Sequence, residues 1–315
     1  MSEQPGNIIR IATRGSRLAL WQTHHVAEKL RAANFTVEIE IIQTKGDLVL
    51  DRSLDKIGAK GVFTEELEES LRNGVVDIAV HSAKDLQSTL PDDLEILAFM
   101  EREKVNDVVI SFDSTFTLDR EQIVVGTSST RRRALLKRYY PEIITAECRG
   151  NLQTRLQKLK DGQYDAILLA YAGVFRMQYS HLITEILPED KFVPAAGQGS
   201  IAIECAKNLP LAKKLALRNC LDHEVTHICL TAERAFLRTM EGGCSIPSFA
   251  LATLHGAHVE ITGGIVSLDG QQMITDTLQA APHEADALGV RLAENILAMG
   301  GDQILNFIKA ERSSI

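Results

Sequence analysis

Residues 123–133 read IVVGTSSTRRR and contain the pattern on which the predicted fold class rests. Three β-branched residues predict a buried strand, four small residues predict a tight turn, and the arginines lie in a helix that we expect to begin near Thr130. Strand, turn and helix in this order form one βα unit. Repeated βα units build sheets that are mainly parallel and covered by helices.

The same alternation extends in both directions from this stretch. Between the expected strands, apolar residues at helical spacing predict helices across 18–30 and 63–71, and another from Asn151. We therefore expect an α/β fold. Short apolar runs predict the further strands at 8–12, 37–42, 75–80, 143–144 and 166–170.

The last third of the chain has a different character. A helix at about 224–240 precedes three expected strands, and Asp269-Gly270 is a good hairpin turn between the last two. These patterns predict a small α+β domain that begins near Leu221. The strands are expected at 249–253, 258–266 and 272–278, and closing helices at 283–299 and 302–310. The polar stretch 101–106 and the segment 194–199 are candidate hinges.

Bulk properties narrow the class of protein. A chain of 315 residues exceeds a typical single core, so we expect two or three domains. No apolar run approaches the roughly 20 residues of a membrane span, and the first residues lack a secretory signal pattern. Five scattered cysteines suit a reducing cytoplasm. The net charge of −8 argues against general nucleic-acid binding.

A basic island lies inside this acidic chain. Between Gly126 and Lys160 there are nine Lys/Arg residues against Glu142 and Glu147. Guanidinium groups match carboxylates and phosphates, and a helix start with Ser/Thr residues completes an anion site. A solvated helix face is the alternative interpretation.

Cations also follow other expected strands, where open parallel sheets bind ligands. They are Arg14, Arg17, Lys84, Arg131, Arg132 and Arg176. This pattern predicts a cleft for an anion with several acidic groups, and no nucleotide-binding glycine motif is present.

Two residues carry possible chemistry. Asp85 would weaken an anion site unless it stabilises a cation or relays protons. On spacing alone, a helix cap or a pair with Lys84 is favoured. Cys244 lies between Gly242-Gly243 and Pro247, which indicates an exposed loop thiol able to carry a covalent group. It could equally be an incidental loop cysteine.

The spacing of His223, His227 and Cys229 could suit a metal, but no second ligand pair stands out, so we expect none.

Seven motifs follow one another along the chain. They are residues 11–16 with 18–22, 60–68, 81–85, 126–129 with 131–132, 149–151 with 154–156, 194–199, and 241–244. In these motifs, and in their order, the sequence resembles the porphobilinogen deaminase (hydroxymethylbilane synthase) family of tetrapyrrole, porphyrin and haem biosynthesis over nearly its whole length.

The resemblance implies a fold and an activity. It implies two α/β lobes like those of periplasmic binding proteins, formed by 1–101 with 198–220 and by 102–197, plus a C-terminal α+β domain at 221–315. The activity is a transferase reaction that joins four porphobilinogen molecules head to tail into hydroxymethylbilane, with release of ammonia. A monomer that binds neither nucleic acid nor membrane is implied as well.

The resemblance also implies roles for individual residues. A dipyrromethane cofactor would be bound by a thioether to Cys244, and Asp85 would be the catalytic aspartate. Cofactor-binding residues would be Lys84, Asp85, Thr127, Ser129, Arg131, Arg132 and Arg149. Substrate-binding residues would be Arg14, Ser16, Lys60, Phe63, Arg149, Arg155, Arg176 and Gln198. Lys60 would end a polar lid at 46–61.

Two positions depart from the family pattern. Gln87 stands where the family usually has proline, so the backbone after Asp85 is expected to be looser. Ser248 replaces a common apolar residue, which would loosen support of the cofactor loop.

Two other functions compete with this activity. One is a non-enzymatic, two-lobed anion-binding protein. The other is a thiol enzyme that uses Cys244 with His255 or His258 as base.

Overall fold

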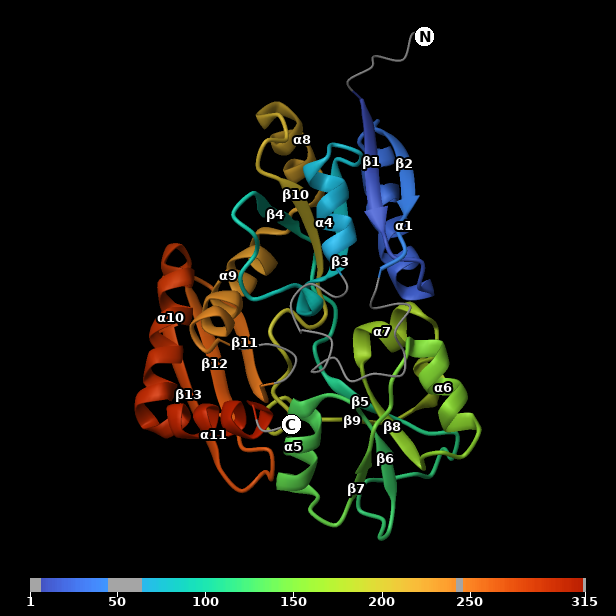
Figure 1. Cartoon of the computed structure of the whole chain (residues 1–315), viewed down its shortest axis with the longest axis vertical. Helices are drawn as coiled ribbons and strands as arrows, with labels where there is room; N and C mark the ends of the chain where they lie inside the picture. Colours follow the sequence, from blue (N-terminus) through green and yellow to red (C-terminus); the bar gives the residue numbers. More distant parts are fainter. Residues whose placement is uncertain (1–6, 45–63, 242–245, 314–315) are drawn as a thin grey trace. The chain divides into compact units, whose positions relative to one another are not determined.

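The computed structural model describes residues 7–44, 64–241 and 246–313. The chain forms two compact units (Figure 1). Unit 1 comprises 1–102 and 200–227, and unit 2 comprises 103–199 and 228–315. The chain passes between the units within the first expected hinge stretch, at the end of the second, and again within helix α9 (Glu224–Thr239). The division into three domains stays a prediction.

Unit 1 contains a five-stranded sheet in the order β2-β1-β3-β10-β4. β1 pairs in parallel with β2 and β3, whereas β10 runs antiparallel to β3 and β4. The strand bounds are β1 (Ile8–Thr13), β2 (Thr36–Ile41), β3 (Ile78–Ser82), β4 (Leu94–Phe99) and β10 (Ile201–Ala206).

Helices cover both faces of this first sheet. Val26 of α1 (Arg17–Ala32) and Leu217 of α8 (Leu211–Leu221) share one apolar cluster with Ile9 of β1. Leu67 of α4 (Glu65–Arg72) packs with Ala12 of the same strand in a second cluster. Since alternate residues of a strand point to opposite faces, α1 and α8 lie on one face and α4 on the other.

Unit 2 repeats this arrangement in a second sheet, in the order β7-β6-β8-β5-β9. β6 pairs in parallel with β7 and β8, and β5 runs antiparallel to β8 and β9. The bounds are β5 (Asp107–Ile110), β6 (Val124–Gly126), β7 (Ile144–Ala146), β8 (Ala166–Ala170) and β9 (Ile183–Ile186).

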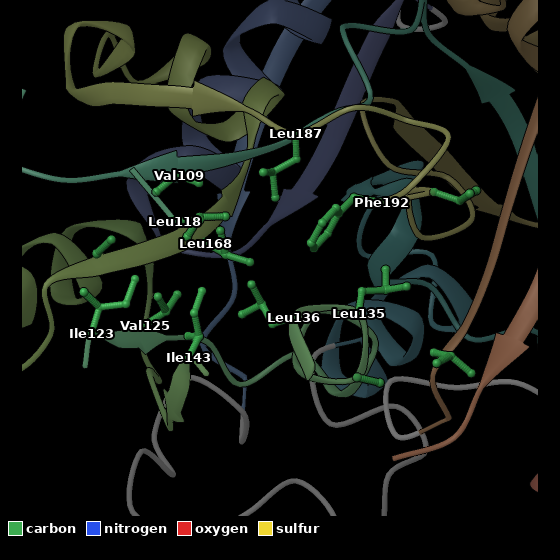
Figure 2. Packing of buried hydrophobic residues seen from close by; sticks show 14 of the residues in the cluster. Val109, Leu118, Ile123, Val125, Leu135, Leu136, Ile143, Leu168, Leu187 and Phe192 are labelled. Atoms are coloured by element: carbon green, nitrogen blue, oxygen red, sulfur yellow. The ribbon is translucent and has the colours of Figure 1, made fainter. Parts of the chain in front are cut away.

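Two helices cover the faces of the second sheet, and a third, α7 (Tyr171–Arg176), follows β8. Figure 2 shows Leu136 of α5 (Thr130–Tyr139) near Leu168 of the sheet and Leu135 near Phe192, and all four belong to one apolar cluster with Val125. Leu156 and Leu159 of α6 (Leu152–Lys160) belong to another cluster with Ile167 of the opposite face.

The C-terminal part of unit 2 is an antiparallel sheet in the order β11-β12-β13. Gly270, with φ at 76°, makes the predicted turn between β12 and β13, and this tip contacts α5, since Arg138 Nη1 donates to Gly270 O at 3.2 Å. The elements are β11 (Ser248–His255), β12 (His258–Val266), β13 (Met273–Ala280), α10 (Ala285–Ile296) and α11 (Asp302–Ser313).

The predicted α/β class with a C-terminal α+β part is confirmed. The prediction of mainly parallel sheets is wrong for half of the pairings in each five-stranded sheet, because β10 and β5 enter the two sheets antiparallel. The strand expected from Val75 begins only at Ile78, because Gly74, with φ at 65°, still belongs to the turn after α4.

No helix of the described residues is both long enough and apolar enough to cross a membrane.

Candidate active site

Asp85 lies just beyond the end of β3, in a short 3-10 turn over Ala83–Asp85. Ala83 and Leu86 are buried, and Ala83 N donates to Ser200 O at 3.0 Å. The backbone on either side of Asp85 is therefore anchored, while the Asp85 side chain is exposed. An anchored, solvent-facing carboxylate is available to a ligand.

The side chain of Gln87 tethers this segment. Its Nε2 donates to Glu68 Oε1 at 3.2 Å and, more weakly, to Thr64 Oγ1 at 3.5 Å. Glu68 also accepts from Thr64 Oγ1 at 2.6 Å, so the start of α4 and the segment after Asp85 form one polar cluster. A hydrogen-bonded side chain thus stands where the family pattern has a proline ring.

Arg14 and Ser16 follow the neighbouring strand β1. β1 and β3 are adjacent and parallel, so both sets of residues lie at the same sheet edge. Ser16 caps α1, because its Oγ accepts from Ala19 N at 3.3 Å, and its hydroxyl proton can still be donated to a ligand. Unit 1 therefore brings Arg14, Ser16, Lys84 and Asp85 to one edge.

In unit 2, Thr127 and Ser129 form the turn between β6 and α5. Thr127 is buried, and its Oγ1 accepts from Ser129 N at 3.3 Å. Ser129 caps α5, with its side chain accepting from Arg132 N at 3.4 Å. This is the predicted strand, small-residue turn and helix start.

Arg131 and Arg132, at the start of α5, are both buried against Asp107. Arg131 Nη2 donates to Asp107 Oδ2 at 2.7 Å, and Arg132 Nη2 donates to Asp107 Oδ1 at 2.7 Å. Burial alone would raise the pKa of Asp107, but the two guanidinium groups outweigh it and hold that pKa well below its usual range. Burial lowers the pKa of Arg131, and Asp107 opposes that shift.

Arg149 and Arg155 follow β7, which runs parallel to β6 in the second sheet. Arg149 Nε donates to Glu147 Oε2 at 3.1 Å, and Arg155 Nε donates to Gly150 O at 2.8 Å. Both side chains are only half-buried. Both arginine side chains are therefore partly exposed to solvent.

Arg176 and Gln198 have internal partners. Arg176 ends α7 rather than following β8 directly, and its Nη2 donates to Gly199 O at 2.7 Å. Burial lowers the pKa of Arg176 to about 10, against the opposing charge of Glu103. Gln198 is buried, and its Nε2 donates to Val105 O at 2.6 Å and to Asp107 Oδ1 at 2.9 Å.

The structure distributes the site residues over both units. Arg14, Ser16, Lys84 and Asp85 belong to unit 1, and the remaining described ones belong to unit 2. Lys60, Phe63, Cys244 and the polar segment 46–61 lie outside the described residues.

The histidines considered for a metal have other partners. His223 Nδ1 contacts Thr226 Oγ1, and His227 Nδ1 contacts Asp222 Oδ1, each at 2.8 Å. Within residues 7–44, 64–241 and 246–313, no group of three or more His, Cys, Asp or Glu side chains could hold a metal ion.

Sequence reasoning missed Asp107 and Glu147 as partners of the arginines. The one signal for Asp107 is a charged residue that opens the apolar run Val108–Ile110. A charge at that place is costly to bury unless it is paired. Glu147 carries no such signal, because acidic residues beside arginines are common on surfaces.

Two protein-family models match the chain. The model described as "Porphobilinogen deaminase, dipyromethane cofactor binding domain" matches residues 9–214, and "Porphobilinogen deaminase, C-terminal domain" matches 227–298. The chain belongs to the porphobilinogen deaminase family. Its predicted membership is thereby confirmed, and the enzyme interpretation is favoured over the non-enzymatic one.

Individual relatives match this chain over nearly the full length of both sequences. Porphobilinogen deaminase of Cytophaga hutchinsonii is 52% identical over 302 residues, which are 96% of this chain and 97% of the relative. The Desulfosudis oleivorans enzyme of the same name is 47% identical, with 97% of this chain and 99% of the relative covered. This family member therefore matches whole deaminases rather than a fragment of them.

Among solved structures, this deaminase-family chain is similar to the VFT2 domain of Bordetella pertussis BvgS. The TM-score is 0.42 and the identity 16%, over 68% of this chain and 87% of that one. A Salmonella typhimurium periplasmic binding protein has a TM-score of 0.39 at 13% identity, over 70% and 94% of the two chains.

Proposed function

We propose that this protein joins four porphobilinogen molecules head to tail and releases one ammonia for each. One water then frees the linear chain as hydroxymethylbilane. The observation that carries the proposal is the exposed carboxylate of Asp85 at a sheet edge that also holds Arg14 and Lys84. Each pyrrole of the substrate carries an acetate and a propionate, so the growing chain is a polycarboxylate. Many cations and one anion are what such a substrate requires.

The residues at the start of α5 fit a dipyrromethane group. Arg131 Nε is buried and has no hydrogen-bond acceptor among the described residues, so a donor is available for a carboxylate. We propose that Lys84, Asp85, Thr127, Ser129, Arg131, Arg132 and Arg149 hold the cofactor, with Cys244 as its thioether anchor. When bound, the dipyrromethane supplies the first two rings from which the product chain is extended.

Asp85 would act on the substrate by electrostatics. Loss of ammonia from the aminomethyl group of porphobilinogen leaves an electron-poor azafulvene, whose protonated form is a cation. The exposed carboxylate of Asp85 stabilises that cation. Its anchored backbone keeps the carboxylate in place while the positive charge develops.

The remaining cations would hold substrate carboxylates. We assign Arg14, Ser16, Lys60, Phe63, Arg149, Arg155, Arg176 and Gln198 to the substrate site, as in the family motifs. The half-buried Arg149 and Arg155 support this assignment, because both side chains are partly exposed to solvent. Arg176 and Gln198 would contribute from within the same unit.

The protein is further proposed to be a cytoplasmic monomer that binds neither nucleic acid nor membrane. Free thiols at Cys148, Cys205 and Cys220 support a reducing compartment, and the net charge of −8 supports the exclusion of nucleic acid.

Replacing Asp85 tests the mechanism. Asp85→Asn should fold and carry the cofactor, yet lose about 10²–10³-fold in kcat, the effect of removing one electrostatic stabiliser. Turnover is measured by hydroxymethylbilane formation, and the cofactor by intact mass. Near-normal turnover would remove Asp85 from the mechanism.

The wild-type protein tests the function itself. Purified from cells that make porphobilinogen, it should carry a two-pyrrole adduct at Cys244 and give a colour with an acidic aldehyde reagent. An unmodified Cys244 thiol would instead favour an anion-binding protein or a thiol enzyme.

A further inference from the structure

Asp107 opens β5, and its side chain is fully buried. Both of its oxygens accept hydrogen bonds from guanidinium groups: Oδ2 from Arg131 Nη2, and Oδ1 from Arg132 Nη2 and Nε, at 2.7, 2.7 and 3.0 Å. The arginine side chains are 5% and 6% exposed. Three charged groups therefore share one interior position at the start of α5.

The charges of this cluster do not balance. One carboxylate faces two guanidinium groups, and the further partners of the arginines, Val193 O and Leu168 O, are neutral. Among the residues that the structure describes, one positive charge therefore remains, and the buried donor Arg131 Nε has no hydrogen-bond acceptor. An uncompensated charge and an orphaned donor are both costly in an interior. A carboxylate from outside the chain would relieve both costs.

Without Asp107, the two arginines would not stay ready for such a ligand. Adjacent guanidinium groups repel each other, and each long side chain loses rotamer freedom when it is fixed. A carboxylate built into the fold removes that repulsion and fixes both side chains before the ligand arrives. This is preorganisation, which favours binding by lowering its ordering cost.

We propose that Asp107 is a positioning residue of the cofactor site: it holds Arg131 and Arg132 together and leaves one positive charge for a cofactor carboxylate. The inference rests on the proposed function of the deaminase. Asp107 contacts the arginines rather than the reacting atoms, so its effect is on cofactor assembly.

Gln198 supports Asp107 in this role. Its Nε2 donates to Asp107 Oδ1 at 2.9 Å and to Val105 O at 2.6 Å. The carboxylate is thereby tied to the backbone just before its own strand. Loss of Gln198 should loosen Asp107 while both ion pairs remain.

The test compares Asp107→Asn with Asp113→Asn in the full chain. Asp113 lies in the same unit, but it is exposed and pairs with the exposed Arg120, so its replacement is a matched control. Protein made without cofactor is incubated with porphobilinogen, and intact mass follows the two-pyrrole adduct on the folded fraction. Asp107→Asn should acquire the adduct at least about tenfold more slowly than wild type, as expected for loss of a charge-assisted hydrogen bond. Asp113→Asn should match wild type.

Two outcomes would overturn the proposal. Adduct formation at the wild-type rate on a less stable Asp107→Asn protein would make Asp107 a purely structural ion pair. Faster formation would show that its charge only opposes anion binding.

Further variants keep the proposal testable if Asp107→Asn does not fold. Asp107→Glu retains the charge and should recover part of the rate, whereas Gln198→Ala should slow adduct formation by a few fold. Wild-type rates in Gln198→Ala would contradict the support role.

A measurement on the cofactor-free protein separates this inference from the proposed function. Acetate should raise the melting temperature of wild type more than that of Asp107→Asn, because only wild type holds both arginines ready for an outside carboxylate. If the wild-type protein never acquires an adduct, the proposed function is wrong. The acetate measurement then tests the role of Asp107 by itself. Equal acetate shifts in both proteins would overturn the role of Asp107.

Discussion

Glu147 pairs with two arginines, of which only one has a predicted role. Its carboxylate accepts from Arg133 Nη1 at 2.9 Å and from Arg149 Nε at 3.1 Å. Arg149 belongs to a family motif and is assigned to substrate, whereas Arg133 has no assigned role. Because both share one partner, they form a matched pair for mutation.

Arg149→Ala should lower kcat/KM for porphobilinogen about ten- to hundredfold, since one charged hydrogen bond is worth about 1.5–3 kcal/mol. Arg133→Ala should stay within about twofold, because an exposed ion pair contributes little. Steady-state kinetics measure both, and intact mass shows whether product chains are retained. Equal losses in the two variants would mean that only the shared pairing with Glu147 matters.

The thiol of Cys205 makes the free energy of unfolding depend on pH in the alkaline range. Burial, reinforced by Glu95, raises the pKa of the Cys205 thiol to about 12. In the unfolded chain the thiol titrates near 8.5. The folded state thus holds the proton more tightly, so the stabilising contribution is complete below about pH 8.5 and is lost as pH rises toward 12.

Urea unfolding between about pH 8 and 11 should show the free energy of unfolding falling with pH, and the fall should be shallower in Cys205→Ala. Cys220→Ala is the comparison, because that thiol is less buried. Identical pH slopes for wild type and Cys205→Ala would contradict the assignment.

At the scale of residues, the sequence predicted the candidate ligand-binding groups, but it did not predict the acidic residues that pair with them. Asp85 and Arg149 stand in recognisable motifs. Asp107 and Glu147 act through pairings that exist only after folding, and Asp107 is 24 positions from Arg131. Local pattern does not contain such partners.

At the scale of elements, the hairpin between β12 and β13 supports the far end of α5. Gly270 lies so close that an added Cβ would be 2.7 Å from Arg138 N and 2.8 Å from Ala134 O, both backbone atoms. Lys137 Nζ also donates to Leu268 O at 3.0 Å. The helix that begins with Arg131 and Arg132 is therefore held at its end by the C-terminal sheet.

Gly270→Ala should destabilise the protein by about 1–3 kcal/mol more than Gly256→Ala, because a clash with backbone adds to the strain of positive φ. Gly256 also has positive φ, at 60°, but an added Cβ there meets no atom within 4 Å. Urea unfolding gives the difference, and intact mass gives the cofactor occupancy. Equal destabilisation would show that the hairpin adapts without cost.

The elements themselves were only partly predictable. Helix α9 and strand β12 fall where the pattern places them, because their periodicity is long. Strands β4, β5, β9 and β10 were not predicted, and the direction of β10 and β5 was missed with them. A short apolar run reveals neither its neighbours nor its direction, since both depend on pairing across the sheet.

At the scale of the whole molecule, β10 completes the first sheet from far along the chain. It lies between β3 and β4, yet the entire 103–199 part of unit 2 precedes it in sequence. Periodicity alone does not indicate that one sheet is interrupted by another. Two sequence signs pointed to this arrangement: the candidate hinge stretches, and the family resemblance, which implies a lobe formed by 1–101 with 198–220.

A fragment that ends at Gly199 should therefore fail to form the first sheet, because β3 and β4 lose the strand that joins them. A fragment that ends at His227 restores β10 and α8. Amide hydrogen exchange should show protected β1 and β3 amides only in the longer fragment. Equal protection in both would show that β1, β2 and β3 are stable without β10.

The late position of β10 has a consequence for synthesis on the ribosome. At about 5–20 residues per second, the roughly 100 residues that separate β4 from β10 take on the order of 5–20 s to emerge. During that interval the nascent chain presents open strand edges at β3 and β4, which are templates for pairing with other chains. The cell must shield those edges or translate quickly through the intervening segment.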